Sequence, residues 1–233
     1  MKAKYTIRIL FLFLMPSIFI SCALMMSMEP METGQVSDMN IYAIKNGIGN
    51  AFLVKANDKY ILIDAGSKAD DFGISLKEAG IDAVDVKWIF LTHSDRDHVA
   101  ALPLFPGAEI YMGKEELPLI NRKVKRNIFG YNSLPDGIDI NRIIPLSNNQ
   151  ELVLNGIKIK CMEASGHTNG SVLYLVDNRY LFTGDAFKIK NGSTLVHPFT
   201  MDKKLSEKTI EQYRETILNS SFVFTSHYGI KEK

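Results

Sequence analysis

The sequence has few cysteines, almost no net charge and no apolar run long enough to span a membrane comfortably. Its 233 residues include two cysteines, Cys22 and Cys161. Cys22 closes an N-terminal targeting segment, so we expect no disulfide between them. The formal net charge is +1, whereas nucleic-acid binders carry a larger or more clustered basic excess. The charge therefore argues against a nucleic-acid partner.

The composition that remains is that of a globular protein. Hydrophobic residues make up 46% of the chain and charged residues 23%, which suits one domain with a good core. The one dense basic run, from Arg122 to Arg126, is interpreted as a solvated helix face or loop. Cys161 lies in a strand-like run with no activating neighbour, so we expect a buried structural thiol.

Residues 1–22 have the pattern of a secretory signal. Basic residues precede an apolar stretch from Ile9 to Ile20, which is shorter than the ~20 residues of a membrane span. The segment ends Phe19-Ile20-Ser21-Cys22, which resembles a bacterial lipoprotein cleavage box. This resemblance implies that Cys22 is lipidated and anchors the protein to a membrane outside the cytoplasm. Ordinary secretion, into the medium or a periplasm, and an uncleaved anchor are the alternatives.

The rest of the chain divides into a tether and one domain. Residues 23–38 lack periodicity and are expected to form a flexible tether, followed by a single domain over 39–233. Apolar runs and turn residues predict strands over 40–44, 51–55, 60–63, 86–91, 109–112, 151–154, 157–162, 172–176, 180–182 and 222–225. Helices are predicted over 70–79 and 205–218, and helical residues over 114–120. Residues 121–145 are expected to be a long loop that shapes a pocket.

The most informative stretch follows the predicted strand Val86–Leu91. Two histidines and two aspartates fall within the six residues His93 to His98, and a helix is expected from Val99. A loop at the end of a buried strand holds its side chains on a rigid scaffold. Imidazoles and carboxylates this close need a shared cation, and a divalent metal suits the mixed nitrogen and oxygen donors.

Three later loops carry side chains of the same kind. His167, Asp185 and His227 each follow an apolar run and lie beside Gly, Thr or Ser. A lone histidine after a strand is usually structural. Four such loops in series use four of the five histidines, which indicates one shared metal site.

The motifs resemble those of the metallo-β-lactamase superfamily, whose first motif is Thr-His-x-His-x-Asp-His. Here it stands as Thr92-His93-Ser94-Asp95-Arg96-Asp97-His98, with Asp95 in place of the second histidine. The later motifs match as Gly166-His167-Thr168, Phe182-Thr183-Gly184-Asp185 and Ser226-His227-Tyr228-Gly229. The resemblance runs from about Asn40 to Gly229. It implies an α/β fold, a four-layer αββα sandwich of two mixed sheets with helices outside and the site at one edge.

The resemblance also implies a ligand set for two divalent metal ions. His93, Asp95 and His167 would hold one metal, Asp97, His98 and His227 the other, and Asp185 would bridge them. A hydroxide would lie between the metals, with Asp97 orienting it and accepting its proton. Zinc is the expected metal. Because of Asp95, manganese or iron is also compatible, as is a site with a single metal.

The expected function is that of a metal-dependent hydrolase, in which the metal-bound hydroxide attacks an ester-like bond of a small molecule. A thioester, a lactone, a phosphodiester and a β-lactam are all compatible. The β-lactam is less favoured because lactamases of this fold usually keep a histidine where Asp95 stands. Thioesterase action of the glyoxalase II type is less favoured because that family adds a helical substrate domain, whereas this chain ends just past His227. The alternatives are a non-catalytic metal-binding lipoprotein with a degenerate site and a di-iron redox enzyme. The substrate and the oligomeric state cannot be read from the sequence.

Four further residues are weaker candidates. His197 follows the Asp185 loop, and it either borders the pocket or is structural. Asp64 is expected to support the site from behind the ligands. Thr168 and Ser171 are expected to hold the His167 loop through their hydroxyls.

Overall fold

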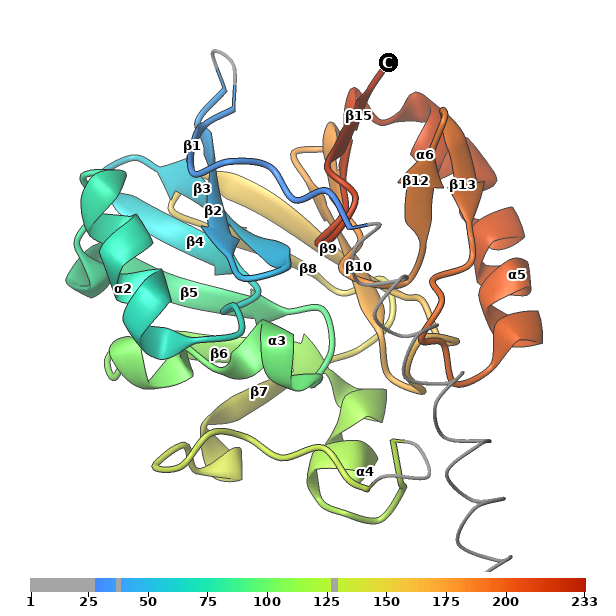
Figure 1. Cartoon of the computed structure of the whole chain (residues 1–233), viewed down its shortest axis with the longest axis horizontal. Coiled ribbons are helices and arrows are strands. Elements are labelled where there is room, and N and C mark those ends of the chain that lie inside the picture. The colour runs from blue at the N-terminus through green and yellow to red at the C-terminus, as the bar shows by residue number, and fades with distance from the viewer. Residues whose placement is uncertain (1–27, 37–38, 127–129) are drawn as a thin grey trace, which may run out of the picture.

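Two mixed β-sheets pack face to face, with helices on their outer faces (Figure 1). A computed structural model describes residues 28–36, 39–126 and 130–233. The predicted signal, its lipidated Cys22 and the first part of the tether lie outside these residues and stay predictions. The αββα architecture predicted from the motifs is confirmed. No helix in the described ranges is long and apolar enough to cross a membrane.

The first sheet has seven strands in sequential order. They are β1 (Gly34–Gln35), β2 (Ile41–Asn46), β3 (Gly49–Ala56), β4 (Lys59–Ile63), β5 (Val86–Leu91), β6 (Glu109–Gly113) and β7 (Ile143–Leu146). Pairing is antiparallel from β1 to β4 and parallel from β4 to β7. Helix α2 (Ala69–Glu78) connects β4 to β5 and buries Phe72 and Leu76 against the outer face of this sheet.

The second sheet has six strands in the order β15-β14-β11-β10-β9-β8. Their bounds are β8 (Glu151–Leu154), β9 (Ile157–Glu163), β10 (Val172–Val176), β11 (Tyr180–Phe182), β14 (Phe222–Phe224) and β15 (Ile230–Glu232). Helices α5 (Lys203–Gln212) and α6 (Arg214–Asn219) follow a separate hairpin of β12 (Lys188–Lys190) and β13 (Ser193–Leu195). Tyr213 and Ile217 pack against the outer face of this sheet.

Aromatic side chains fill the space between the sheets. Phe52 lies 5.5 Å from Phe182 and 5.1 Å from Phe224, measured between ring centroids. Phe90 stacks on Tyr111 with centroids 4.7 Å apart. Burying such rings is the main stabilising term of the sandwich. It fixes the two sheets relative to each other, and therefore fixes the loops at their shared edge.

Short helical segments complete the connections. They are the 3₁₀ turns Ala83–Asp85, Leu102–Leu104, Lys114–Glu116 and Ile140–Arg142, and the helices α3 (Arg96–Val99) and α4 (Leu117–Ile120). The helix expected from Val99 begins earlier, at Arg96, and is four residues long. Two further predictions need correction. The loop predicted over 121–145 ends in strand β7, and the helix predicted over 205–218 divides at Tyr213, whose φ of −100° and ψ of 12° interrupt it.

The segment before the first long strand lies on the fold. Residues 28–36 fall within the predicted tether, yet Glu29 N donates to His227 O at 2.8 Å. Asn50 accepts from Met31 N at 2.7 Å and donates to Met31 O at 2.8 Å. Strand β1 then pairs with β2. The folded unit therefore includes residues 28–36.

Candidate metal centre

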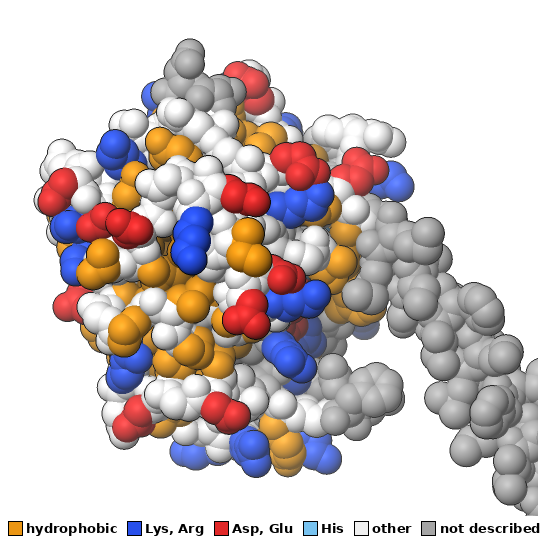
Figure 2. Space-filling model, turned by 60° about the vertical axis from the view of Figure 1, so that its left-hand side comes forward, with side chains coloured by type: hydrophobic (Ala, Val, Ile, Leu, Met, Phe, Trp, Pro, Cys, Tyr) orange, Lys and Arg blue, Asp and Glu red, His pale blue; other side chains and the backbone are white. Residues whose placement is uncertain are grey.

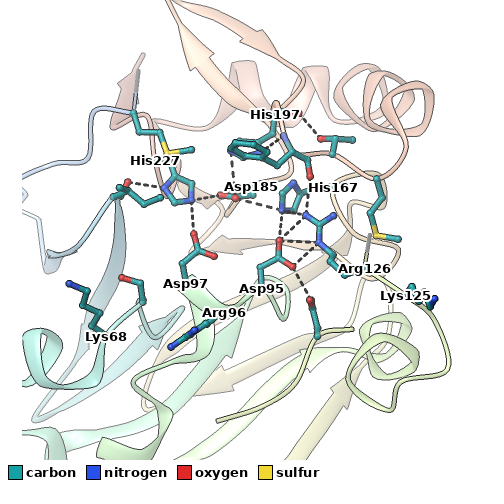
Figure 3. Close-up of a pocket in the computed structure, with 17 residues that line it drawn as sticks. Lys68, Asp95, Arg96, Asp97, Lys125, Arg126, His167, Asp185, His197 and His227 are labelled. Carbon is teal, nitrogen blue, oxygen red and sulfur yellow. Dashed lines mark hydrogen bonds and ion pairs between the residues drawn. The ribbon is translucent and has the colours of Figure 1, made fainter. Parts of the chain in front are cut away.

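All seven side chains predicted as ligands meet at one edge of the sandwich. Figure 3 labels those that line the pocket there, Asp95, Asp97, His167, Asp185 and His227. They come from the loops after β5, β9, β11 and β14, as the motifs predicted. The predicted ligands are His93, Asp95, Asp97, His98, His167, Asp185 and His227. An open pocket of about 1350 Å³ lies over them, which is large enough for a small-molecule substrate.

The side chains form two triads. Within each triad the donor atoms lie within 4.8 Å of one another. The first triad is His93, Asp95 and His167, and the second is Asp97, His98 and His227. These two groups match the triads that the resemblance implied, and a further group, His93, His98 and Asp185, crosses between them.

Asp185 lies between the two triads. Its Oδ1 is 3.2 Å from His227 Nε2 and 3.6 Å from His98 Nε2. Its Oδ2 is 3.6 Å from His167 Nε2. One carboxylate therefore faces both triads, the position expected for a bridging ligand.

Several of these atoms are buried without a hydrogen-bond partner among the described residues. They include His93 Nε2, His98 Nε2 and Asp185 Oδ1. Buried polar atoms in folded proteins nearly always have partners, and an orphaned group costs free energy. Nitrogen and carboxylate donors that converge in this way fit a divalent cation of the zinc, manganese or iron type.

Partners behind the ligands fix the orientation of two imidazoles. Asp64 Oδ2 lies 2.9 Å from His98 Nδ1, and Asp64 also accepts from Thr92 N at 2.8 Å. His227 Nδ1 lies 2.8 Å from the carbonyl oxygen of Ile48. Each contact leaves Nε2 facing the centre, the arrangement usual behind metal-binding histidines. Asp64 therefore lies behind His98, in the supporting position that the sequence predicted.

Glu116 joins two of the ligand loops and was not singled out from the sequence. It is fully buried, and it accepts from Ser94 N at 2.9 Å and Ser94 Oγ at 2.6 Å. It also accepts from Thr168 Oγ1 at 2.6 Å and Gly170 N at 3.1 Å. Its carboxylate therefore ties the His93 loop to the His167 loop. In the sequence it is one acid of a polar turn, which gives no signal of this role.

Thr168 and Ser171 hold the His167 loop as expected. Their hydroxyls lie 2.7 Å apart, and Thr168 N donates to Ser171 Oγ at 3.0 Å.

Strong electrostatic coupling links the acids and imidazoles. Burial by itself raises the pKa of Asp185, but His227, His197 and His98 outweigh it and hold this pKa well below its usual range. Burial lowers the pKa of His227, but Asp185 and Asp97 outweigh it and raise the value to about 10. Without a metal, protons therefore take the place of the cation at these imidazoles.

His197 belongs to the wall of the centre. Its Nε2 is buried without a described hydrogen-bond partner and lies 3.6 Å from Asp185 Oδ2. Together with His167 and Asp185 it forms another group of donors within 4.8 Å. Burial lowers its pKa to about 3, so the ring is neutral at physiological pH and its nitrogen can bind a metal. The sequence left the role of His197 open, and the structure shows it bordering the pocket.

Arg126 is the unexpected member of the centre. The run from Arg122 to Arg126 was interpreted as solvated, and Lys123 and Lys125 are exposed, but Arg126 is only 8% exposed. Its Nε lies 2.7 Å from Asp95 Oδ1 and its Nη2 lies 2.8 Å from Asp95 Oδ2. The interpretation was therefore wrong for this residue. The half-buried carboxylate of Asp95 pairs with this arginine and accounts for its inward position.

Comparison with known proteins agrees with this geometry. The family model described as the metallo-beta-lactamase superfamily matches residues 44–218. The chain belongs to this superfamily. A curated relative, the metallo-beta-lactamase fold-containing protein ST1585 of Sulfurisphaera tokodaii, is 25% identical over 203 residues, which is 78% of this chain and 74% of the relative. The hydroxyacylglutathione hydrolase of Glaesserella parasuis is 35% identical over 102 residues, 42% of this chain and 34% of that protein.

Solved structures of superfamily members share the fold. The archaeal protein ST1585 from Sulfolobus tokodaii superposes with a TM-score of 0.62 at 23% identity, covering 83% of this chain and 82% of that one. MEM-A1, a subclass B3 metallo-beta-lactamase from a soil metagenome library, gives a TM-score of 0.65 at 17% identity, with 85% and 80% covered. At these identities the likeness concerns the fold alone.

Proposed function

We propose that this member of the superfamily is a metal-dependent hydrolase that cleaves an ester-like bond in a small molecule. The observation that carries the proposal is the convergence of buried donor atoms at one pocket, among them His93 Nε2 and His98 Nε2, which have no described hydrogen bond. Such atoms fit a resident cation better than a purely structural network, which would pair them. Membership of a superfamily that is generally hydrolytic supports the same reading.

The donor set indicates which residues would hold the metal. The candidate ligands are the two triads and Asp185, as the sequence predicted. Zinc, manganese and iron each suit two imidazoles with a carboxylate. When bound, such an ion polarises a C=O or P=O group and makes water a nucleophile near neutral pH.

Asp97 is placed to handle a proton. Its side chain is 33% exposed and faces the pocket, and its Oδ2 lies 3.4 Å from His227 Nε2. Burial by itself raises the pKa of Asp97, but His98 and His227 outweigh it and lower the value to about 2. An ionised carboxylate at the pocket floor can accept a hydrogen bond from an attacking water and orient it, and a metal that acidifies this water would let so weak a base take the proton.

The pocket lining favours an anionic substrate with an apolar part. Lys68, Arg96 and Lys125 line it together with Ile48 and Phe199. A cationic rim attracts carboxylate or phosphate groups. We therefore favour a thioester, lactone or phosphodiester that carries a negative charge. The resemblance to a hydroxyacylglutathione hydrolase over part of the chain supports the thioester.

Replacing Asp185 by Asn tests the proposal. The protein, loaded with Zn²⁺, Mn²⁺ or Fe²⁺, is assayed against a chromogenic thioester, a lactone, bis(p-nitrophenyl) phosphate and a chromogenic cephalosporin. Asp185→Asn removes the charge facing both triads, so we expect turnover to fall by about 100-fold or more. Asp58→Asn, in the exposed β3–β4 turn, controls for loss of a carboxylate and should keep full activity.

Two outcomes would contradict hydrolysis. Metal binding with no turnover of any ester in the wild type would favour the alternative of a non-catalytic metal-binding protein. Iron bound in preference to zinc, together with reduction of oxygen, would favour the di-iron redox alternative.

A further inference from the structure

Arg126 occupies the position that a cation would take in the first triad. Its Nη2 lies 2.8 Å from Asp95 Oδ2 and 3.1 Å from His167 Nε2 (Figure 3). These two acceptor atoms are themselves 3.2 Å apart. One nitrogen of the guanidinium thus contacts two of the three donors that a first metal would need.

We propose that Arg126 replaces the first metal, so that the protein binds a single metal ion, held by the second triad together with Asp185. The inference rests on the proposed function, and it specifies what the metal centre contains. It departs from the pair of metals that the family motifs implied.

The contact with His167 makes arginine and metal alternatives. A neutral imidazole nitrogen offers one lone pair, and a guanidinium only donates hydrogen bonds. His167 Nε2 therefore either accepts from Arg126 or carries a proton that faces Asp95 Oδ2, and in neither state is its lone pair free to bind a metal. Arginine stays protonated in proteins. Its positive charge therefore cannot be removed by loss of a proton, as the charge of a protonated imidazole can.

The replacement of the first metal by Arg126 also explains why an aspartate, Asp95, stands where the family motif has a histidine. Its two oxygens receive the fork of Nε and Nη2, a bidentate geometry that gives strong charge-assisted hydrogen bonds. Asn132 Nδ2 donates to Asp95 Oδ1 as well, at 2.9 Å. The histidine that the family motif has at this position could not accept such a fork. The departure from the motif and the buried arginine are thus complementary.

Arg126 is also fixed from the opposite wall. Its Nη2 donates to the carbonyl oxygen of Phe199 at 2.9 Å. The side chain therefore contacts three segments that are far apart in the sequence, those of Asp95, His167 and Phe199. These several hydrogen bonds fix the position of Arg126 and make it a structural component of the site.

The second triad has no such substitute among the described residues. Asp97 is paired only with His98 and His227 there, at 3.8 Å and 3.4 Å. His98 Nε2 is buried without a described hydrogen bond, and Asp185 Oδ1 lies 3.6 Å from it and 3.2 Å from His227 Nε2. The second triad offers the three protein donors of a catalytic metal site, and Asp185 lies beside them as a further donor.

Metal stoichiometry tests the inference. The full chain is equilibrated with excess Zn²⁺, passed through a desalting column, and its zinc is counted by mass spectrometry. We expect one zinc per chain in the wild type and two in Arg126→Ala, because Asp95 and His167 are then released. Titration with Zn²⁺ should show the second ion binding about 100-fold more tightly in Arg126→Ala than in the wild type, since removing a buried charge partner strongly favours a replacement cation.

Two variants serve as matched controls. Lys123→Ala removes an exposed cation from the same basic run, and it should keep one zinc. Arg126→Gln keeps side-chain bulk while removing the charge, and should bind two if Arg126→Ala proves too unstable to purify. Melting temperature provides a second readout, because Zn²⁺ should raise it more in the Arg126 variants than in the wild type.

The outcomes separate this inference from the proposed function. Two zinc ions in the wild type, or one in both Arg126 variants, would overturn the replacement by Arg126 and leave the hydrolase proposal intact. No zinc in any variant, and no manganese or iron when these ions are supplied instead, would contradict the metal-dependent function itself.

Discussion

The imidazoles of His98 and His227 hold protons more tightly than a free histidine does. Burial lowers the pKa of His98, but Asp64, Asp185 and Asp97 outweigh it and raise this pKa well above its usual range. The pKa of His227 rises to about 10. In the metal-free protein this shift of His227 stabilises the fold fully below pH 6.5, and the contribution is lost as the pH rises through 10.

Metal affinity should therefore rise with pH. A metal must displace these protons, so the association constant should increase about tenfold per pH unit for each proton released. Competition with a chelator of known affinity at pH 6, 7 and 8 measures this slope. An affinity that does not change over this range would show that the two imidazoles bind no metal.

Cys161 should be inert in the native protein. It is 1% exposed, and burial raises the pKa of its thiol to about 12. Only the thiolate attacks a disulfide reagent. With Cys22 replaced by Ser, Ellman's reagent at pH 8 should find almost no reactive thiol until guanidinium unfolds the chain, and one thiol afterwards. Rapid reaction of the folded protein would refute the buried position.

At the scale of elements, Glu116 connects the turn after β6 to two ligand loops. In all four of its described hydrogen bonds, the Glu116 carboxylate accepts from an N–H or O–H group. In Glu116→Gln an amide NH₂ replaces one acceptor and faces a donor, which costs about 1–3 kcal/mol. For a chain of this length that lowers the melting temperature by about 2–12 °C.

The neighbouring Glu115 is the matched control. Its side chain is 54% exposed and its ion pair with Lys114 is 3.8 Å long, so Glu115→Gln should leave the melting temperature within about 2 °C. Calorimetry compares both variants with the wild type. Equal melting temperatures for the two variants would show that Glu116 does not stabilise the connection between these loops.

Most strands could be predicted because they are apolar runs that end in turn residues. Strand β7 was missed because it contains Pro145, which argues against a strand interior. The structure places β7 at the edge of its sheet, where a proline is tolerated. Strands β1 and β15 have two and three residues, too few for alternation to be detectable.

The convergence of the candidate ligands could be predicted for the same reason that the strands could. Each lies directly after an apolar run, so a local pattern marks it. Arg126 and Glu116 lie in segments without such a pattern, and their partners are distant in sequence. Arg126 meets Asp95 across a separation of 31 residues, and Glu116 meets Thr168 across 52. Contacts of this kind depend on how the sheets pack, which a single sequence does not reveal.

At the scale of the whole molecule, acidic and basic side chains are interspersed over the face shown in Figure 2. This matches the net charge of +1. Cationic residues that line the pocket, among them Lys68 and Arg96, therefore act locally. Their attraction for an anionic substrate should fall off over about 8 Å at physiological ionic strength.

Metal binding should stabilise the entire fold, since the candidate ligands belong to both sheets. A ligand at 100 times its dissociation constant adds about 2.7 kcal/mol to the free energy of unfolding. For a domain of this size the melting temperature should rise by about 5–10 °C. Differential scanning fluorimetry with and without Zn²⁺ measures the shift, and EDTA should reverse it. An unchanged melting temperature would argue against a metal in the centre.

The hydrogen bond between His227 and Ile48 has a consequence for the order of events during synthesis. It joins residues separated by 179 positions, so the first hairpin waits for its partner until nearly all later residues have been made. At about 5–20 residues per second, a nascent chain displays the His93 loop for on the order of ten seconds before His227 exists. During that interval only part of the candidate ligand set has been synthesised. A metal that requires His227 could therefore bind completely only after the last strands have closed the second sheet.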